Sequence, residues 1–354
     1  MTATGCYNLG DEIILKAEVA FIKSQYENVD ITVFTYDKES TLLPEWSVRY
    51  VNYFPNRFWR HPLRNIWYFF ENIWLIRSAD FLIIGGGGLI FDNERGISYP
   101  ALLRQWRFRT KLARIFGTHI FFWSLGLEVK KAYNRTKLKK LFVSDDIITV
   151  RDERSLGLLE SLEYVARLVP DSAFLLESNN SVVMRNPPRV GFSLRSGFLT
   201  EAEEKAVPEI VKTLESRWFE VLFLSHSFSK EAEHNDLECI RRIMKDHTYA
   251  ITFTLAESME AYRSLSYMVG MRYHSGILAA AHGIPVLMVP YGPKSVELMR
   301  ILEIPESIES GYFTHEEFFL HWDSLVANYE TRKFAIIQKY DTIHKELIKK
   351  LDEV

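Results

Sequence analysis

The feature that most constrains the fold is a repeated alternation of short apolar runs with longer amphipathic segments. A parallel sheet needs a crossover helix between consecutive strands, so this alternation is typical of a sheet covered by helices. In the first half of the chain, strands are expected at 31–35, 81–84, 120–124, 147–150 and 167–169, with helices between them, for example at 12–24 and 100–116.

A second alternating unit follows a linker around 178–188, which has no apolar period and ends in two prolines. Its expected strands are 190–194, 221–224, 250–252, 267–270 and 286–289, and its expected helices include 200–216 and 236–245. We therefore predict an α/β protein with two Rossmann-like, doubly wound domains, 1–178 and 188–325, that face a cleft. Residues 326–354 are expected to form a helix that packs back on the first domain.

The start of the chain departs from this pattern. Residues 5–12 have the sequence of a strand-to-helix turn, yet only Met1 to Thr4 precede them. A central strand of about five residues is expected there, and without it the neighbouring strands lack a hydrogen-bonding partner. Either the reading frame begins late or this sheet differs from the usual one.

The composition indicates a water-soluble chain with more than one core. At 354 residues and 47% hydrophobic content, the chain is long enough for two domains. It has neither a secretory signal nor an apolar run of roughly 18 to 20 residues. Cys6 and Cys239 are far apart and lack metal-type spacing, so free thiols are expected. These features predict a cytoplasmic protein, with peripheral contact at the inner face of the membrane left open.

The net charge of −3 conceals a basic region at residues 49–140, which has 17 Lys and Arg against 5 Asp and Glu. Its cations are interleaved with aromatic residues, for example at 54–61, 66–70 and 104–109. This mixture suits a surface that faces anionic lipid or a lipid-linked diphosphate, but it also fits core aromatics with solvated cations. Nucleic acid is not expected, because none of the usual binding motifs is present.

One segment, Met271 to Ile277, places Arg272 and His274 where a strand at 265–270 is expected to meet a helix at 275–282. Ligands of open α/β sheets bind at the carboxyl ends of strands, and a helix N-terminus there attracts anions. The segment is therefore a candidate anion site with a titratable imidazole. A surface ion pair and a structural histidine are the alternative.

Other candidate site residues follow strands in the same way. Arg151 comes directly after 147–150 and either points into the cleft or pairs with Asp152 or Glu153 on the surface. Lys294 follows 286–289 and a rigid turn, so three strand ends offer cations for a small polyanion.

The glycine run and the first helix supply further candidates. Gly85, Gly86, Gly87 and Gly88 follow a buried strand, where backbone N–H groups approach an anion without hindrance; a tight turn with no ligand is the alternative. Asp11 is expected in the first turn of a helix, where an acid serves either the helix dipole or catalysis.

In combination, these segments resemble the polysaccharide pyruvyl transferase family. The matching segments are Asn8 to Glu12, Gly85 to Leu89, Arg151-Asp152, Asp171 to Phe174, Arg272 to Ser275, Gly283 to Pro285 and Tyr291 to Lys294. The chain departs from the family at the missing first strand and at 125–128, where a Gly-x-Gly-Pro-like turn is more usual.

The resemblance implies a fold similar to the GT-B glycosyltransferases and transfer of a pyruvyl group from phosphoenolpyruvate to a sugar, without a metal or cofactor. The sugar belongs to a cell-surface or exopolysaccharide precursor, lipid-linked or free. Arg272, Arg151 and Lys294 are then expected to hold the donor with the backbone of Gly86 to Gly88, and Asn8 is expected to contact substrate. His274 is the expected acid and Asp11 the expected base. A nucleotide-sugar glycosyltransferase and a non-catalytic, membrane-associated assembly protein are the alternatives.

Overall fold

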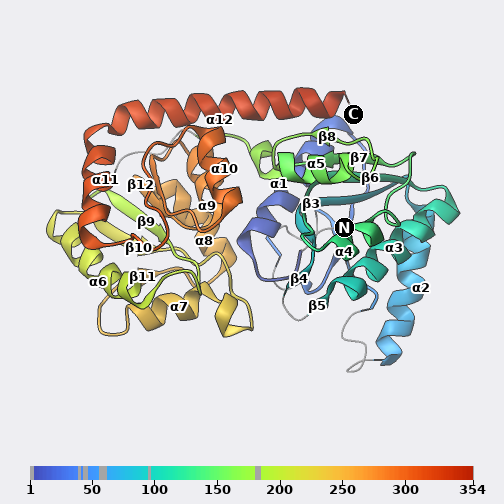
Figure 1. Ribbon diagram of the computed structural model, residues 1–354, viewed down its shortest axis with the longest axis horizontal. Helices are drawn as coiled ribbons and strands as arrows, with labels where there is room; N and C mark the ends of the chain where they lie inside the picture. The colour runs from blue at the N-terminus through green and yellow to red at the C-terminus, as the bar shows by residue number, and fades with distance from the viewer. Residues whose placement is uncertain are drawn as a thin grey trace. The chain divides into compact units, whose positions relative to one another are not determined.

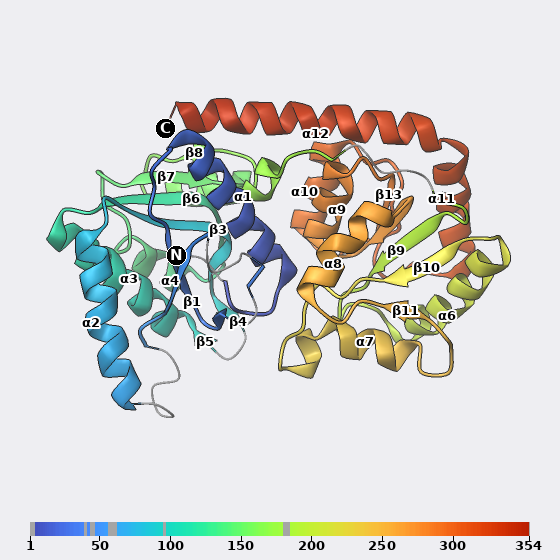
Figure 2. The same cartoon turned by 180° about the vertical axis from the view of Figure 1, so that it is seen from behind.

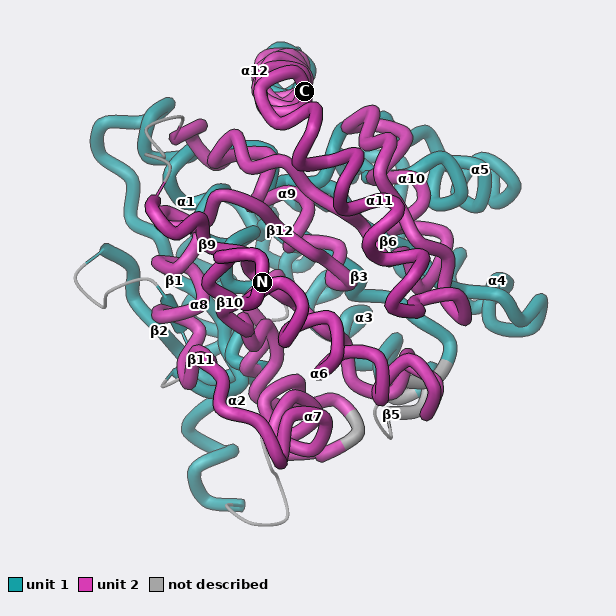
Figure 3. The backbone as a smooth tube through the Cα atoms, turned by 90° about the vertical axis from the view of Figure 1, so that its left-hand side faces the viewer, with its two compact units in different colours: residues 1–6, 11–175, 347–354 teal, residues 7–10, 176–346 magenta. Residues whose placement is uncertain are grey.

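A computed structural model describes residues 4–38, 41–42, 47–55, 62–94, 97–179 and 185–353. The chain divides into two compact units, which Figure 3 shows in teal and magenta. Unit 1 consists of residues 1–6, 11–175 and 347–354, and unit 2 of residues 7–10 and 176–346. The change of unit between residues 175 and 176 lies near the linker predicted at 178–188.

Unit 1 is built on a four-stranded parallel sheet in the order β3-β6-β7-β8 (Figure 1). A parallel pair, β1-β2, and a short antiparallel pair, β4-β5, form separate sheets. The strands are β1 (Thr32–Thr35), β2 (Arg49–Asn52), β3 (Phe81–Phe91), β4 (Asn93–Glu94), β5 (Ile97–Ser98), β6 (His119–Glu128), β7 (Ile147–Val150) and β8 (Arg167–Leu168).

Helices connect these strands and bury one face against the sheet. They are α1 (Leu9–Gln25), α2 (Pro62–Ser78), α3 (Tyr99–Phe116), α4 (Ala132–Leu138) and α5 (Glu153–Glu160). Apolar residues of neighbouring strands, such as Ile84, Phe122 and Val150, are buried in one core cluster with Leu103 of α3 and Leu159 of α5. Burial on both faces explains why these strands appear in the sequence as continuous apolar runs.

Unit 2 contains a five-stranded, fully parallel sheet in the order β11-β10-β9-β12-β13. The first strand of the unit is therefore central, and the order reverses between β9 and β12. The strands are β9 (Arg189–Ser193), β10 (Glu220–Phe223), β11 (Ala250–Ile251), β12 (Tyr267–Gly270) and β13 (Val286–Met288).

Several helices of unit 2 begin at side-chain caps. In α6, Thr200 and Glu203 form a reciprocal capping box, which satisfies two N–H groups that the helix leaves open. The helices are α6 (Glu201–Ser216), α7 (Asp236–Ile243), α8 (Leu255–Ala261), α9 (Tyr273–Ala281), α10 (Pro293–Leu302), α11 (His315–Ala327) and α12 (Tyr329–Asp352). Residues 347–354, at the end of α12, belong to unit 1.

The predicted strands and long helices are confirmed within a few residues, with two corrections. The glycine run at 85–88 is not a turn, because it continues β3 and pairs with β6. The segment 125–128 likewise continues β6 rather than forming a turn. Glycine allows β3 to continue through residues 85–88, because Gly86 and Gly87 have φ of 71° and 86°, which glycine adopts easily. The register with β6 shifts between Gly87 and Ile90.

Three other expectations concern the start of the chain, its hydropathy and its cysteines. The strand expected before Gly5 falls mainly on residues 1–3, outside the described residues. Across the part of the chain that is described, no helix has the length and hydropathy needed to cross a bilayer. Cys6 and Cys239 are free thiols, as predicted.

Candidate active site

The topology of unit 2 points to one edge of its sheet. Ligands of doubly wound sheets bind beyond the carboxyl ends of the strands, where the strand order reverses. Here that position lies between β9 and β12. The chain leaves β9 through Leu194 and Arg195, and it leaves β12 through Met271 and Arg272. Two arginines therefore follow the two strands at the reversal.

Arg272 is fixed by a buried carboxylate. It caps α9 with extended backbone, φ −71° and ψ 135°, and its Nε donates to Asp236 Oδ2 at 3.0 Å. A second bond joins its Nη2 to Oδ1 of Asp236, whose side chain is fully buried. Burial alone lowers the pKa of Arg272, but Asp236 outweighs burial and raises it. The guanidinium is therefore charged and held in one orientation.

Arg195 is a site residue that the sequence reasoning missed. Its guanidinium carbon lies 4.0 Å from the ring centroid of Tyr291 and 4.3 Å from that of Phe198. Burial lowers its pKa, Arg272 adds to this effect, and Tyr291 and Asp236 oppose it. The backbone N–H of the next residue, Ser196, donates to Asp236 Oδ1 at 3.4 Å, so Arg195 adjoins the residue that contacts the carboxylate of Arg272. Two guanidinium groups against one carboxylate leave a net positive site suited to an anion.

His274 lies in the first turn of α9, next to the start of α1. A Cβ atom on Gly10 would lie 2.1 Å from His274 Nδ1, so only glycine permits this approach. Asn8 Oδ1 accepts a hydrogen bond from the Gly10 N–H at 3.1 Å, which engages the predicted substrate-binding amide at the helix start. The family segment at 8–10 is thus explained in part by packing against the imidazole.

A second histidine, His226, contacts the carboxylate that holds Arg272. It is buried, its Nε2 lies 3.0 Å from Tyr262 Oη, and its backbone N–H donates to Asp236 at 3.2 Å. Burial, Arg272 and His274 all lower its pKa far below the usual range, so this imidazole is neutral. It has a structural role that no local sequence pattern indicated.

Lys294 lies at the same edge of the sheet as Arg272. It is the second residue of α10, which begins at Pro293 after β13, the strand beside β12. Unit 2 therefore brings Arg272, His274 and Lys294 to adjacent strand ends, as the sequence predicts, and adds Arg195.

In unit 1, Arg151 is buried rather than on the surface. Its side chain is 6% exposed, and its Nη1 donates to the buried Asp171 Oδ2 at 2.7 Å. The alternative pairing with Asp152 is present but is not a surface contact: Asp152 caps α5 through Ser155 N, and its Oδ2 lies 3.9 Å from the buried Arg151 Nε. Asp171, from the segment 171–174, is the shorter and fully buried partner of this arginine.

Glycines on neighbouring strands make room for Arg151. A Cβ atom on Gly126 of β6 would lie 2.7 Å from its Nε, and one on Gly88 of β3 would lie 3.7 Å from its Nη2. The guanidinium therefore lies over the carboxyl end of the unit 1 sheet. Its orientation toward a cleft with unit 2 stays a prediction.

The glycine run also serves packing against α1. A Cβ atom on Gly86 would overlap Ile14 Cγ2 at 1.9 Å, and one on Gly85 would lie 3.2 Å from Glu18 Oε1. Asp11 lies in the first turn of α1, and a Cβ atom on Gly87 would lie 3.6 Å from its Oδ1. Gly88 is exposed, so its backbone is the part of the run best placed for a ligand.

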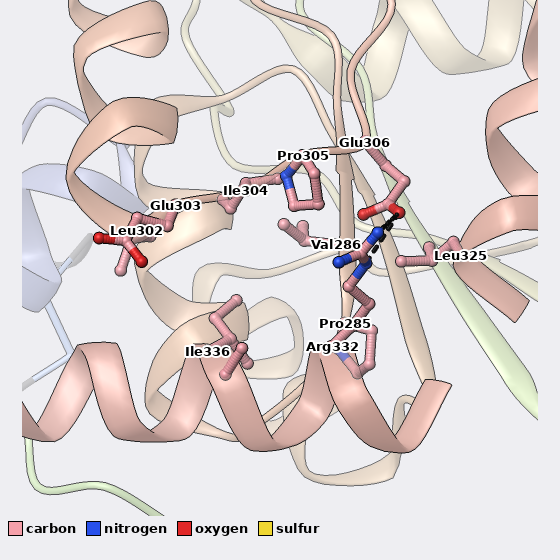
Figure 4. A pocket seen from close by; sticks show the side chains of 11 residues that line it. Pro285, Val286, Leu302, Glu303, Ile304, Pro305, Glu306, Leu325, Arg332 and Ile336 are labelled. Atoms are coloured by element: carbon pink, nitrogen blue, oxygen red, sulfur yellow. Dashed lines mark hydrogen bonds and ion pairs between the residues drawn. The ribbon is translucent and has the colours of Figure 1, made fainter. Parts of the chain in front are cut away.

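A recess elsewhere in unit 2 does not fit a catalytic site. Its lining includes Pro285 and Val286 at the amino end of β13, the edge opposite Arg272. Figure 4 shows Arg332 of α12 reaching Glu306, and the Nη2–Oε1 distance is 2.7 Å. Within the described ranges, no group of three or more His, Cys, Asp or Glu is arranged to hold a metal.

Comparison with solved structures defines the class of fold. A putative UDP-N-acetylglucosamine 2-epimerase from Listeria monocytogenes has a TM-score of 0.59 at 12% identity, covering 94% of this chain and 88% of its own. UDP-GlcNAc 2-epimerase from Neisseria meningitidis, bound to UDP-GlcNAc, gives 0.57 at 11%, covering 96% and 97%. A UGT transferase from Siraitia grosvenorii, in complex with UDP, gives 0.56 at 9%, covering 98% and 94%. The fold is therefore the GT-B type of two Rossmann-like units.

The family follows from the sequence. The profile of the polysaccharide pyruvyl transferase family matches residues 8–293, which include all of the candidate site residues predicted from the sequence except Lys294. The chain belongs to this family, which is a family of transferases. No curated protein sequence gives a match.

Proposed function

We propose that this protein transfers a pyruvyl group from phosphoenolpyruvate to a sugar of a cell-surface or exopolysaccharide precursor and forms a ketal. The observation that carries the proposal is the cationic strand-end site of unit 2, with Arg195 after β9, Arg272 after β12 and His274 in the adjoining helix turn. Phosphoenolpyruvate carries up to three negative charges and needs both cations and an acid.

The donor contacts are assigned by charge. Arg272 presents a planar guanidinium that Asp236 already orients, and such a group binds carboxylate or phosphate through two parallel bonds. Arg195 and Lys294 add two more positive charges at the same strand ends. Arg151 and the backbone of the glycine run, Gly88 above all, are the unit 1 groups assigned to the donor.

The reaction starts with a proton transfer to carbon. His274 donates a proton to the methylene carbon of the enol, which leaves C2 with cationic character. A sugar hydroxyl forms a bond to C2 and gives its proton to Asp11. The C2–O bond to phosphate breaks, and a second hydroxyl of the same sugar closes the ring and passes its proton to the phosphate. Asp11 releases its proton to solvent and His274 takes one up, so over a full turnover the two hydroxyl protons account for the new methyl hydrogen and the phosphate proton.

The experiment measures phosphate release from phosphoenolpyruvate in the presence of a panel of hexose and N-acetylhexosamine glycosides. We expect acceptor-dependent release by the parent. His274→Asn should reduce turnover by about 100-fold or more, the range of general acid catalysis, while calorimetry still shows donor binding. Equal turnover in the variant would remove His274 from this role, and binding without release for every acceptor would contradict the reaction.

A nucleotide-sugar glycosyltransferase is the second candidate, because two of the similar structures carry UDP or UDP-GlcNAc. It predicts tight binding of a nucleoside diphosphate and no response to phosphoenolpyruvate. Calorimetry with UDP and with phosphoenolpyruvate separates the two functions without knowledge of the acceptor.

A further inference from the structure

Helix α2 exposes a continuous apolar stripe. Five large side chains, Leu63, Ile66, Trp67, Phe70 and Trp74, are 55–80% exposed. Their spacing places all five within an arc of about 100° on a helix with 3.6 residues per turn. We refer to these five residues as the α2 stripe.

The α2 stripe is not the core-facing side of the helix. The buried residues of α2 are Asn65, Asn72, Leu75 and Ile76, which lie on the opposite side, and Leu75 and Ile76 belong to the core of unit 1. Elsewhere in the described chain, exposed large apolar residues such as Trp218 and Leu320 are scattered. Single exposed residues need no explanation, whereas a contiguous patch indicates an interaction surface.

Exposed basic residues lie on the neighbouring helix. Helix α3 packs along α2, as Figures 1 and 2 show, and exposes Arg104, Arg107 and Lys111 at helical spacing on one face. Within the described residues, none of these three forms an ion pair with a carboxylate. Arg109, by contrast, is 2% exposed and stacks on Tyr53 at 4.4 Å, so the basic segment divides into core and surface cations.

The positive charge of α3 and of the end of α2 favours an anionic bilayer over a second copy of the chain as the partner of the α2 stripe. A second copy seated symmetrically on the stripe would bring two identical basic helices together, which like-charge repulsion opposes. An anionic bilayer accepts Trp, Phe and Leu at the level of its headgroups and attracts Lys and Arg beside them. Arg77, on the same arc at the end of α2, is exposed and adds to this attraction.

We propose that α2 and the basic face of α3 form a docking surface for an anionic lipid bilayer. The α2 stripe inserts at the headgroup level, and Arg104, Arg107 and Lys111 contact lipid phosphates. This surface needs neither donor nor acceptor, so it stands independently of the proposed chemistry. It would bring the protein to the place where a lipid-linked acceptor resides.

The test is vesicle sedimentation with phosphatidylcholine alone and with phosphatidylcholine mixed with phosphatidylglycerol. The parent should bind the mixed vesicles, and Trp67→Ser/Phe70→Ser/Trp74→Ser should lose this binding. A matched control, Trp218→Ser/Leu320→Ser/Phe334→Ser, removes three equally exposed apolar side chains of unit 2 and should bind as the parent does. Arg104→Gln/Arg107→Gln/Lys111→Gln should weaken binding by roughly fivefold for each cation removed.

Two results would overturn the docking surface: no binding of mixed vesicles by the parent, or equal binding by the α2 variant. A parent that is dimeric, ignores vesicles and becomes monomeric in the α2 variant would assign the stripe to a second copy instead. Circular dichroism and thermal unfolding confirm that each variant is folded. Phosphoenolpyruvate binding should be unchanged in all of them, so failure here is distinct from failure of the proposed reaction.

Discussion

At the scale of single residues, the buried pair between Arg272 and Asp236 is the most consequential contact of the site. Asp236→Asn leaves a buried guanidinium without its counter-charge, and removing one partner of a buried pair costs about 3–5 kcal/mol. We expect a loss of this size in the urea unfolding free energy, with weakened phosphoenolpyruvate binding.

The control for this prediction is Asp323→Asn. Asp323 pairs with Arg217 on the surface, where both side chains are largely exposed, so its loss should cost about 0–1 kcal/mol. Similar effects of the two substitutions would show that burial of Asp236 contributes nothing to stability.

Gly10 is a second residue whose role depends on a single contact. Gly10→Ala places a methyl group where the His274 imidazole lies, so the ring must move, and a displacement of about 1 Å can reduce turnover by about 100-fold. Gly157→Ala in α5 meets no neighbouring atom and should leave turnover unchanged. Steady-state kinetics of both variants test this; unaltered activity in Gly10→Ala would mean that the imidazole position is unimportant.

The sequence could predict which cations lie at strand ends but not what holds them. Arg151 and Arg272 follow apolar runs closely, Lys294 follows one after a rigid turn, and that local signal was sufficient. Asp171 and Asp236 are 20 and 36 residues from their arginine partners, and only the tertiary fold brings them into contact. Arg195 follows β9 in the same way, so the strand-end signal applied to every strand could have found it.

At the scale of elements, α1 carries a buried acid against the glycine run. Burial raises the pKa of Glu18 to about 8. The folded state therefore retains a proton that the unfolded chain releases near pH 4.5. The stabilisation is complete below that pH and is lost as the pH rises through about 8.

Glu18→Gln should consequently reduce the dependence of the unfolding free energy on pH. The unfolding free energy of the parent is expected to fall as the pH rises from about 4.5 to about 8, and the variant should lose less over the same interval. Urea titrations across that range measure the difference. Parallel curves for parent and variant would place the Glu18 carboxyl in water rather than beneath the sheet.

The elements that were misjudged are those whose pattern permits two structures. A glycine run after a strand suits a turn equally well, and the close approach of Ile14 and Glu18 explains why β3 continues through it instead. Helix α2 is apolar on both faces, so periodicity cannot say which face is buried. Its aromatic residues were consistent with a core or with an interfacial surface, and the structure exposes Trp67, Phe70 and Trp74.

At the scale of the whole molecule, two parallel α/β units and the family follow from the sequence because each depends on patterns repeated along the chain. Parallel strands rise about 3.3 Å per residue and are buried on both faces, so each strand appears in the sequence as a short apolar run. Each crossover between strands appears as an amphipathic helix. The identity of the donor depends instead on a few cationic side chains that bind an anionic molecule, and the fold alone does not specify them.

Calorimetric titration with phosphoenolpyruvate, and separately with UDP, decides whether the strand-end cations of unit 2 bind the proposed donor. We expect the parent to bind phosphoenolpyruvate and not UDP, and Arg195→Ala to weaken binding by about 10- to 100-fold, as expected for one charge-assisted contact. Binding of UDP by a folded parent that ignores phosphoenolpyruvate would contradict the proposed function.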